Sequence, residues 1–347
     1  MTEQIPQVYL DQNILSEMSK GQFHGLFDQI CSGKMQLIYS HIHITETARC
    51  SNQDFRISVI QTLTTMNGAY IHESKLYFDK SPQLRLEECL ANPAAYERTS
   101  SCFAQFAHKF FGGQQGKNFQ SLIDAQQESF ADLMREMSKN IEMLSESEKA
   151  EIQHLLPMLQ ALPILGQQQF KEQAAKLSAR LEDIPSSETF NGAKEFRGAM
   201  EIAPVSLNNI RPPNVMQKVW KQVCASGKIP SQLSGVSYFL EKGVCAHIKD
   251  GEPTWEAKIG SLYSLLNFIG YFPDEDLHKD NGFRSGMGDQ IHACYAAFAQ
   301  LFITCDERMA KKTYAVYEQL GIGTRVCWCK SDKKGGVVLL AGEEIFQ

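Results

Sequence analysis

The sequence predicts an α/β fold: a parallel sheet split along the chain, with a mostly helical segment inserted between its two parts. Strand-like and helix-like segments alternate at both ends of the chain, as they do where crossover helices join parallel strands. Between them, residues 51–275 show mostly helical spacing. Hydrophobic residues make up 43% of the 347 residues, which is ordinary for a globular protein.

The first part of the predicted sheet covers residues 1–50. IPQVYL, residues 5–10, is a short apolar strand, and MQLIYSHIHIT, residues 35–45, is a second strand rich in β-branched residues. Helical spacing predicts one helix between them, over residues 16–33, and ETARCS begins another helix after the second strand.

The predicted helical insertion covers residues 51–275. Its strongest helical spacing lies in residues 121–162 and 170–184, and few of its segments resemble strands. Pro and Gly residues punctuate residues 185–213, which predicts loops there.

The second part of the sheet covers residues 276–347. MGDQIHACYAAFAQ, residues 287–300, is predicted to be helical because its apolar residues recur at helical spacing. LFITC, residues 301–305, and TRVCWC, residues 324–329, are apolar strands on either side of a helix at residues 307–321 that ends in glycine.

Charge and cysteine content limit the classes of function. The formal net charge is −6, so the charge of the whole chain does not favour nucleic acid. No segment approaches the roughly 20 apolar residues of a membrane span, and the first residues lack the pattern of a signal peptide. The ten cysteines lack the spacing of a disulfide framework. We therefore expect a cytoplasmic protein with reduced thiols and no membrane partner.

Four acidic residues fall at equivalent places in the strand–helix alternation. Asp11 ends the first strand, Glu46 opens the helix after the second, Asp289 lies near the start of a helix, and Asp306 follows the next strand. The carboxyl ends of parallel strands share one edge of a sheet, where ligands bind. Carboxylates gathered there repel one another, and Mg²⁺ or Mn²⁺ relieves that repulsion with oxygen ligands. Such a site can activate water for phosphoryl hydrolysis.

The same segments resemble the PIN-domain nucleases. VYLDQNILSE is similar to the opening strand and Asp of that family, and SHIHITETAR to its second strand and Glu. GDQIHACYAAFAQLFITCDERMAKK is similar to its third acidic helix, last strand and final Asp. The resemblance covers about residues 1–50 and 280–330 and departs from the family in the long separation of Glu46 from Asp289.

The resemblance implies a PIN-like three-layer fold and a metal-dependent endonuclease, most often one that cleaves RNA. Family members include toxins, RNA-processing factors and defence effectors, and the expected partners besides nucleic acid are a regulatory protein or further copies of this chain. Glu46 would either complete the metal site or orient the attacking water. The implied site has four acids that hold Mg²⁺ or Mn²⁺ and two polar supports: Asp11, Glu46, Asp289 and Asp306, with Asn13 and Thr304.

Two other functions stay open for the same fold. A DNA nuclease of the flap-endonuclease kind would carry more acids and a helical DNA-binding motif after its site, for which few residues follow Asp306. A PIN-fold scaffold without catalysis would use its acids only at helix starts. There, an Asp side chain accepts a hydrogen bond from the backbone, and the helix dipole favours negative charge.

Two motifs are similar to those of other hydrolases. His41, His43 and Glu46 spell H-x-H-x-x-E, and on a strand both imidazoles would share a face, as in hydrolases with paired histidines on a barrel strand. The further strands and ligands of such a barrel are not visible in the sequence. D-Q-N at residues 11–13 resembles the D-x-D start of haloacid-dehalogenase phosphatases, with Asn in place of the second Asp.

Three basic residues follow the last acid: Arg308, Lys311 and Lys312. They are candidates for contact with a phosphate backbone. The alternative is an ordinary solvated helix face.

Overall fold

The computed structural model describes residues 5–72, 75–78, 80–93, 107–108, 110–113, 191–228, 248–249 and 252–341, with isolated positions between 131 and 175. The chain forms two compact units, and the unit that holds the sheet comprises Met1–Arg98, Ala193–Leu277 and Asn281–Gln347. The helices predicted over residues 121–162 and 170–184 lie outside the described residues, apart from isolated positions. In the part of the chain that is described, no helix is long and apolar enough to cross a membrane.

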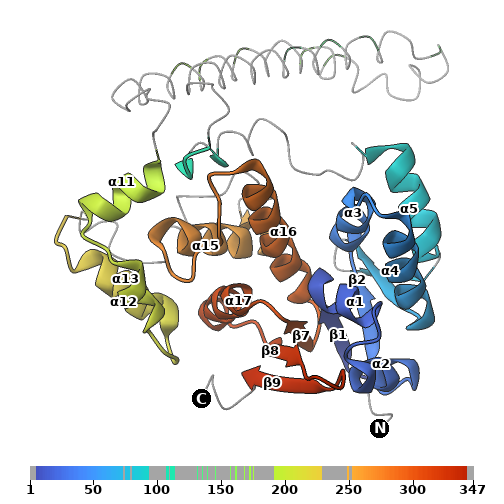
Figure 1. The fold of residues 1–347 in the computed structure, drawn as a ribbon. Helices are drawn as coiled ribbons and strands as arrows, with labels where there is room; N and C mark the ends of the chain where they lie inside the picture. Colours follow the sequence, from blue (N-terminus) through green and yellow to red (C-terminus); the bar gives the residue numbers. More distant parts are fainter. Residues whose placement is uncertain are drawn as a thin grey trace. The chain divides into compact units, whose positions relative to one another are not determined.

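A seven-stranded sheet forms the centre of the larger unit (Figure 1). Its strands are β1 (Gln7–Leu10), β2 (Gln36–Tyr39), β3 (Ala69–His72), β4 (Lys75–Tyr77), β7 (Leu301–Thr304), β8 (Arg325–Ser331) and β9 (Val337–Ala341). They lie in the order β4-β3-β2-β1-β7-β8-β9. The five inner strands, β3, β2, β1, β7 and β8, are parallel to one another. The edge strands β4 and β9 pair antiparallel with their neighbours. The predicted α/β class with a mainly parallel sheet is confirmed.

Eleven helices are described, together with a separate two-stranded sheet of β5 (Ile248–Lys249) and β6 (Glu252–Pro253). The helices are α1 (Gln12–Met18), α2 (His24–Cys31), α3 (His41–Arg49), α4 (Gln53–Thr65), α5 (Pro82–Ala91), α11 (Gly192–Ala199), α12 (Pro204–Asn208), α13 (Val215–Cys224), α15 (Trp255–Ile269), α16 (Asp280–Ala296) and α17 (Glu307–Leu320).

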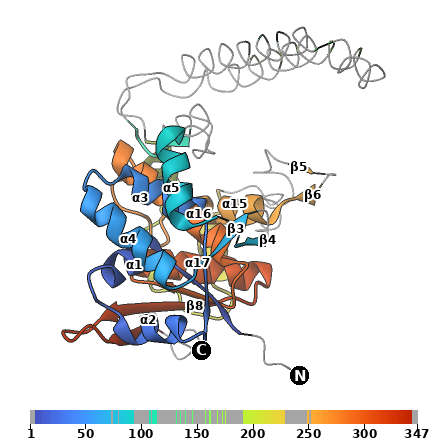
Figure 2. The ribbon, with the colours of Figure 1, turned by 90° about the vertical axis from the view of Figure 1, so that its right-hand side faces the viewer.

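Strand β1 is buried on both faces and separates two hydrophobic cores. Because successive side chains of a strand point to opposite faces, Val8 and Leu10 pack with α1, α2, α4 and α5, whereas Tyr9 packs with α13, α15, α16 and α17. Figure 1 shows α4 and α5 on one side of β1 and α15 and α17 on the other. In Figure 2, α3, α4 and α5 lie toward the viewer, in front of α16 and α17. Helices therefore cover both faces of the sheet.

The sheet extends into the segment that the sequence assigned to the helical insertion. Strand β3 pairs with β2 through Ile38 and Ala69, and β4 follows it at the edge of the sheet. Helices α13 and α15, also within residues 51–275, pack in the core beside β1. Short strands between helices carry little periodic signal, which is why the sequence pattern did not find β3 and β4.

Three predicted boundaries near the acids are wrong. The second strand stops at Tyr39 and the chain turns into α3, so Glu46 lies within that helix. Helix α16 begins well before Asp289, which therefore lies in its middle. The single helix predicted over residues 16–33 is two helices, because Gly21 and Phe23 adopt left-handed backbone angles (φ 82° and 55°) between α1 and α2.

The placement of α15 in the core predicts a large effect of shortening one of its buried side chains. Leu262 is 0% exposed, so Leu262→Ala is expected to lower the free energy of unfolding by about 2–5 kcal/mol. Leu90 in α5 is 46% exposed, and Leu90→Ala should change the free energy of unfolding by less than about 0.5 kcal/mol. Urea unfolding measures both, and equal small changes would contradict the core position of α15.

Candidate functional site

Asp11 and Asp306 lie side by side at the carboxyl edge of the sheet. Strands β1 and β7 are neighbours, and each of these residues follows one of them. Each is also a helix N-cap, since Asp11 Oδ1 accepts the Ile14 N–H at 2.8 Å and Asp306 Oδ1 accepts the Met309 N–H at 2.9 Å. Capping therefore fixes one oxygen of each carboxylate.

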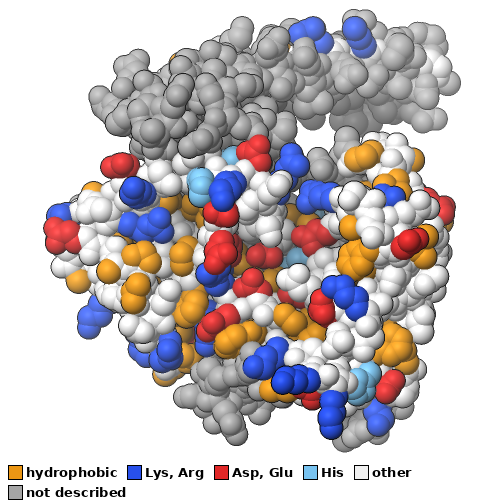
Figure 3. Space-filling model, in the orientation of Figure 1, with side chains coloured by type: hydrophobic (Ala, Val, Ile, Leu, Met, Phe, Trp, Pro, Cys, Tyr) orange, Lys and Arg blue, Asp and Glu red, His pale blue; other side chains and the backbone are white. Residues whose placement is uncertain are grey.

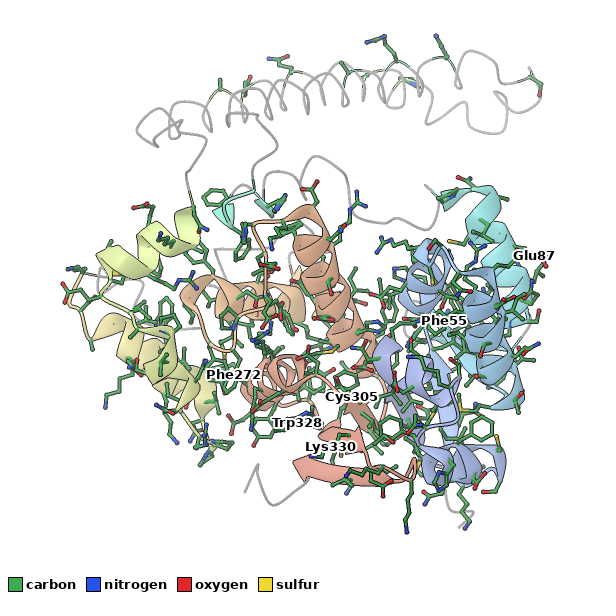
Figure 4. All side chains as sticks on the ribbon, viewed as in Figure 1. Phe55, Glu87, Phe272, Cys305, Trp328 and Lys330 are labelled. Carbon is green, nitrogen blue, oxygen red and sulfur yellow. The ribbon has the colours of Figure 1, made fainter. Side chains whose placement is uncertain are left out.

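Thr304 connects the two caps. Its hydroxyl donates to Asp11 Oδ2 and accepts the backbone N–H of Asp306 at 2.9 Å. The following turn is held by Trp328, whose indole Nε1 donates to the Cys305 carbonyl at 3.2 Å; Figure 4 labels both residues. The structure thus places Thr304 in contact with the site, as a polar support would be.

Asp11 is in an environment that disfavours its charge. The side chain is 2% exposed, and burial raises its pKa to about 6, against the lowering effect of the Thr304 and Ile14 hydrogen bonds. The neighbouring Asp306 carboxylate adds to the rise. A positive charge brought to this edge would stabilise the ionised form.

Glu46 reaches the same edge from α3 and is held by a histidine that the sequence analysis did not find. Its Oε2 lies 3.2 Å from His292 Nε2, and His292 Nδ1 lies 3.0 Å from the hydroxyl of Tyr9. The Tyr9 hydroxyl in turn lies 2.7 Å from Ser40 Oγ. A Cβ at Gly288 would lie 2.5 Å from Glu46 Oε1, so a side chain at this position of α16 would displace the carboxylate.

Asp289 completes the set from the middle of α16. Burial raises its pKa well above the usual range, and the carboxylates of Asp274, Asp306 and Glu46 raise it further, while Lys312 lowers it. Asp289 thus interacts with Asp306 and Glu46, Asp11 interacts with Asp306, and the structure adds Asp274 to the acids near Asp289. Figure 3 shows acidic side chains gathered on the face where α16, α17 and the start of α1 meet.

Lys312 supplies a positive charge inside this acidic cluster. Its ammonium is 0% exposed, forms an ion pair with Asp274 and donates to Asn267 Oδ1 at 2.7 Å. Asn267 Nδ2 donates to the other oxygen of Asp274 at 2.8 Å. Both oxygens of Asp274 are thus engaged, and its charge is balanced within the fold.

The prediction that Lys312 contacts a phosphate backbone is therefore wrong, because its side chain is buried and paired. Lys311 is 9% exposed, and its ammonium lies 5.9 Å from the centre of the Trp328 ring. The side chain of Arg308 is 41% exposed, the most of the three basic residues, and its guanidinium lies 2.5 Å from Glu275.

Asn13 and the paired histidines do not join the acids. Asn13 is exposed in α1 and takes no part in the hydrogen bonds described above. His41 and His43 lie on α3, not on a strand, so the histidine pattern of barrel hydrolases is absent here. His43 Nδ1 accepts the Ser40 N–H at 3.0 Å, which leaves its Nε2–H to donate to the Leu10 carbonyl at 2.7 Å. His43 is a buried link between two strand ends.

The donors at this edge fit a hard divalent cation in their chemistry, because they are carboxylate oxygens that burial leaves short of positive charge. The Tyr263 hydroxyl is buried beside Asp289 and Asp306 and has no hydrogen-bond partner among the described residues. Within the same described part, no three His, Cys, Asp or Glu side chains form an assembled metal-ligand group. Metal binding would therefore require Asp11, Asp289 and Asp306 to draw closer together.

Comparisons of this chain with protein-family models, curated proteins and solved structures gave no match. The function proposed below therefore depends on the geometry of the site itself.

One of the missed residues carried a signal that could have been used. His292 follows Asp289 by three positions, a spacing that puts both on one face of a helix. Asn267 and Asp274 lie in the segment assigned to the insertion, and nothing in their spacing connects them to Asp306. Their pairing with Lys312 depends on how α15 packs against α17.

Removing the buried ammonium is expected to destabilise the protein strongly. Lys312→Met leaves the Asp274 carboxylate buried without its partner, so the free energy of unfolding should fall by about 3–5 kcal/mol in denaturant unfolding. Arg308→Met breaks an exposed pair on the same helix and should cost less than about 1 kcal/mol. Similar small losses for both variants would contradict the burial of the Lys312 pair.

His43 predicts a pH dependence of stability. Burial lowers the pKa of His43 well below 6.5. As the pH falls, His43 is therefore protonated in the unfolded chain before it is protonated in the folded protein. The contribution of neutral His43 is fully present above about pH 6.5 and is lost as the pH falls, at up to about 1.4 kcal/mol per pH unit. His43→Gln should flatten this slope between pH 7 and pH 5 in urea unfolding carried out at each pH.

Proposed function

We propose that this protein is a metal-dependent endonuclease that hydrolyses phosphodiester bonds, with RNA as the preferred substrate. The observation that carries the proposal is the crowding of carboxylates at the carboxyl edge of the sheet. Burial raises the pKa of both Asp11 and Asp289. Proteins rarely gather such groups unless a cation or a reaction requires them.

In this proposal, Asp11, Asp289 and Asp306 hold Mg²⁺ or Mn²⁺. When bound, the cation would lower the pKa of a bound water and stabilise the charge on phosphoryl oxygens. Glu46 either completes the cation site or orients the attacking water. Thr304 keeps Asp11 and Asp306 in place, and Lys312 offsets part of the negative charge from inside the fold.

The resemblance of the segments around these acids to PIN-domain nucleases supports nucleic acid as substrate and favours RNA. Cleavage of DNA by the same site is the first alternative. The second is a scaffold without catalysis, which is favoured by the capping bonds of Asp11 and Asp306. The partners that go with this proposal, besides nucleic acid, are a regulatory protein or further copies of this chain.

The test is cleavage of end-labelled single-stranded RNA and matching DNA by the purified protein with Mn²⁺, with Mg²⁺ or with EDTA. We expect cleavage of RNA that requires metal and is abolished in Asp11→Asn and Asp306→Asn, because an amide oxygen is a much poorer ligand than a carboxylate. Asp28→Asn, at an exposed acid of α2, should cleave like the wild type.

The outcomes separate the alternatives. If the protein cleaves DNA and not RNA in the presence of metal, it is a nuclease whose substrate is DNA. If the folded wild-type protein neither cleaves nucleic acid nor binds Mn²⁺ in calorimetry, the nuclease proposal is wrong. The scaffold without catalysis is then the remaining alternative.

A further inference from the structure

Glu46 is held by a chain of buried hydrogen bonds whose directions can be assigned. An ionised carboxylate can only accept, so the bond of 3.2 Å to Glu46 Oε2 places the proton of the pair on His292 Nε2. In the neutral tautomer with its proton on Nε2, Nδ1 of His292 accepts from the Tyr9 hydroxyl at 3.0 Å, and Tyr9 then accepts from Ser40 at 2.7 Å. Tyr9, Ser40 and His292 are 0%, 0% and 2% exposed, so no competing water reaches the chain from bulk solvent.

The other oxygen of Glu46 lies close to α16 at Gly288. Glu46 Oε1 lies so close to Gly288 that a Cβ there would be 2.5 Å away. His292 therefore holds the carboxylate at Oε2, while Oε1 lies against Gly288 of α16. Since His292 occupies Oε2, Oε1 is the oxygen left to accept a further proton.

Glu46 stands apart from the other acids. Its side chain is 22% exposed, whereas Asp11 is 2% exposed, so Glu46 is the acid that water reaches more easily. Asp289 is affected more strongly by Asp274 and Asp306 than by Glu46. Glu46 therefore differs from Asp11 in its access to water and from Asp306 in its weaker effect on Asp289.

We propose that His292, held by Tyr9 and Ser40, is a positioning residue that orients Glu46 to take a proton from the attacking water. This inference rests on the proposed nuclease function. The water O–H bond breaks and its proton goes to Glu46 Oε1, while the water oxygen forms a bond to phosphorus. The bond from phosphorus to the leaving oxygen breaks, and that oxygen takes a proton from solvent. Glu46 then returns its proton to solvent, and His292 keeps its own throughout.

The test compares kcat, KM and Mn²⁺ affinity in a double-variant cycle of Glu46→Gln and His292→Phe. Glu46→Gln should lower kcat by about 10²–10⁴-fold, as expected for loss of a general base. His292→Phe keeps a ring without its N–H and should lower kcat by about 10–100-fold. The double variant should be no slower than Glu46→Gln, because His292 acts only through Glu46. The dissociation constant for Mn²⁺, measured by calorimetry, should stay at the wild-type value in all three.

Two further variants distinguish positioning from general packing. His292→Gln restores an N–H donor and should recover most of the kcat that His292→Phe loses. Tyr9→Phe removes the hydroxyl that holds His292 and should lower kcat. Tyr317→Phe removes another buried hydroxyl, which donates to the Ala293 carbonyl of α16 at 2.5 Å, and should leave kcat unchanged.

Three results would overturn the role of His292 while wild-type cleavage stands: additive losses in the double variant, loss of Mn²⁺ affinity in His292→Phe, or equal slowing by Tyr9→Phe and Tyr317→Phe. Absence of wild-type cleavage overturns the proposed function and this inference with it.

Discussion

The site is built around buried negative charge that the fold only partly balances. Asp11, Asp289 and Asp274 lie where water cannot solvate them well, and desolvation of a carboxylate is costly unless hydrogen bonds or positive charge compensate for it. Each acid is given a different compensation. Asp11 receives the Ile14 N–H and the Thr304 hydroxyl, Asp274 receives Lys312 and Asn267, and Asp289 has Lys312 only at a distance. The elements that meet at this edge are held together by these bonds.

Capping and cation binding are compatible uses of the same carboxylates. Asp11 and Asp306 each give Oδ1 to a backbone N–H at the start of a helix. That bond fixes the rotamer of the side chain and thereby the direction of Oδ2. A residue that looks like an ordinary cap can therefore also be a rigid ligand, and the capping geometry alone does not decide between scaffold and enzyme.

The sequence predicted the parts of the fold that depend on local pattern and missed the parts that depend on packing. The strands that precede Asp11 and Asp306 are apolar segments followed by residues at helical spacing. Their positions could therefore be predicted from the sequence. The end of β2 could not, because HIHIT is as apolar and β-branched as a strand. Ser40 and His43 turn it into a helix through bonds to each other and to Leu10. Lys312 looked like a surface cation because its burial depends on Asp274, which lies far from it in the chain.

The close approach of Glu46 to Gly288 has a consequence for how this chain can change in evolution. Position 288 can gain a side chain only if position 46 loses its carboxylate or moves it, since a Cβ would occupy the space of Oε1. The two positions are far apart in the sequence, but the Glu46 carboxylate and a side chain at position 288 would occupy the same space. Where residue 46 has no carboxylate, this contact no longer opposes a side chain at position 288.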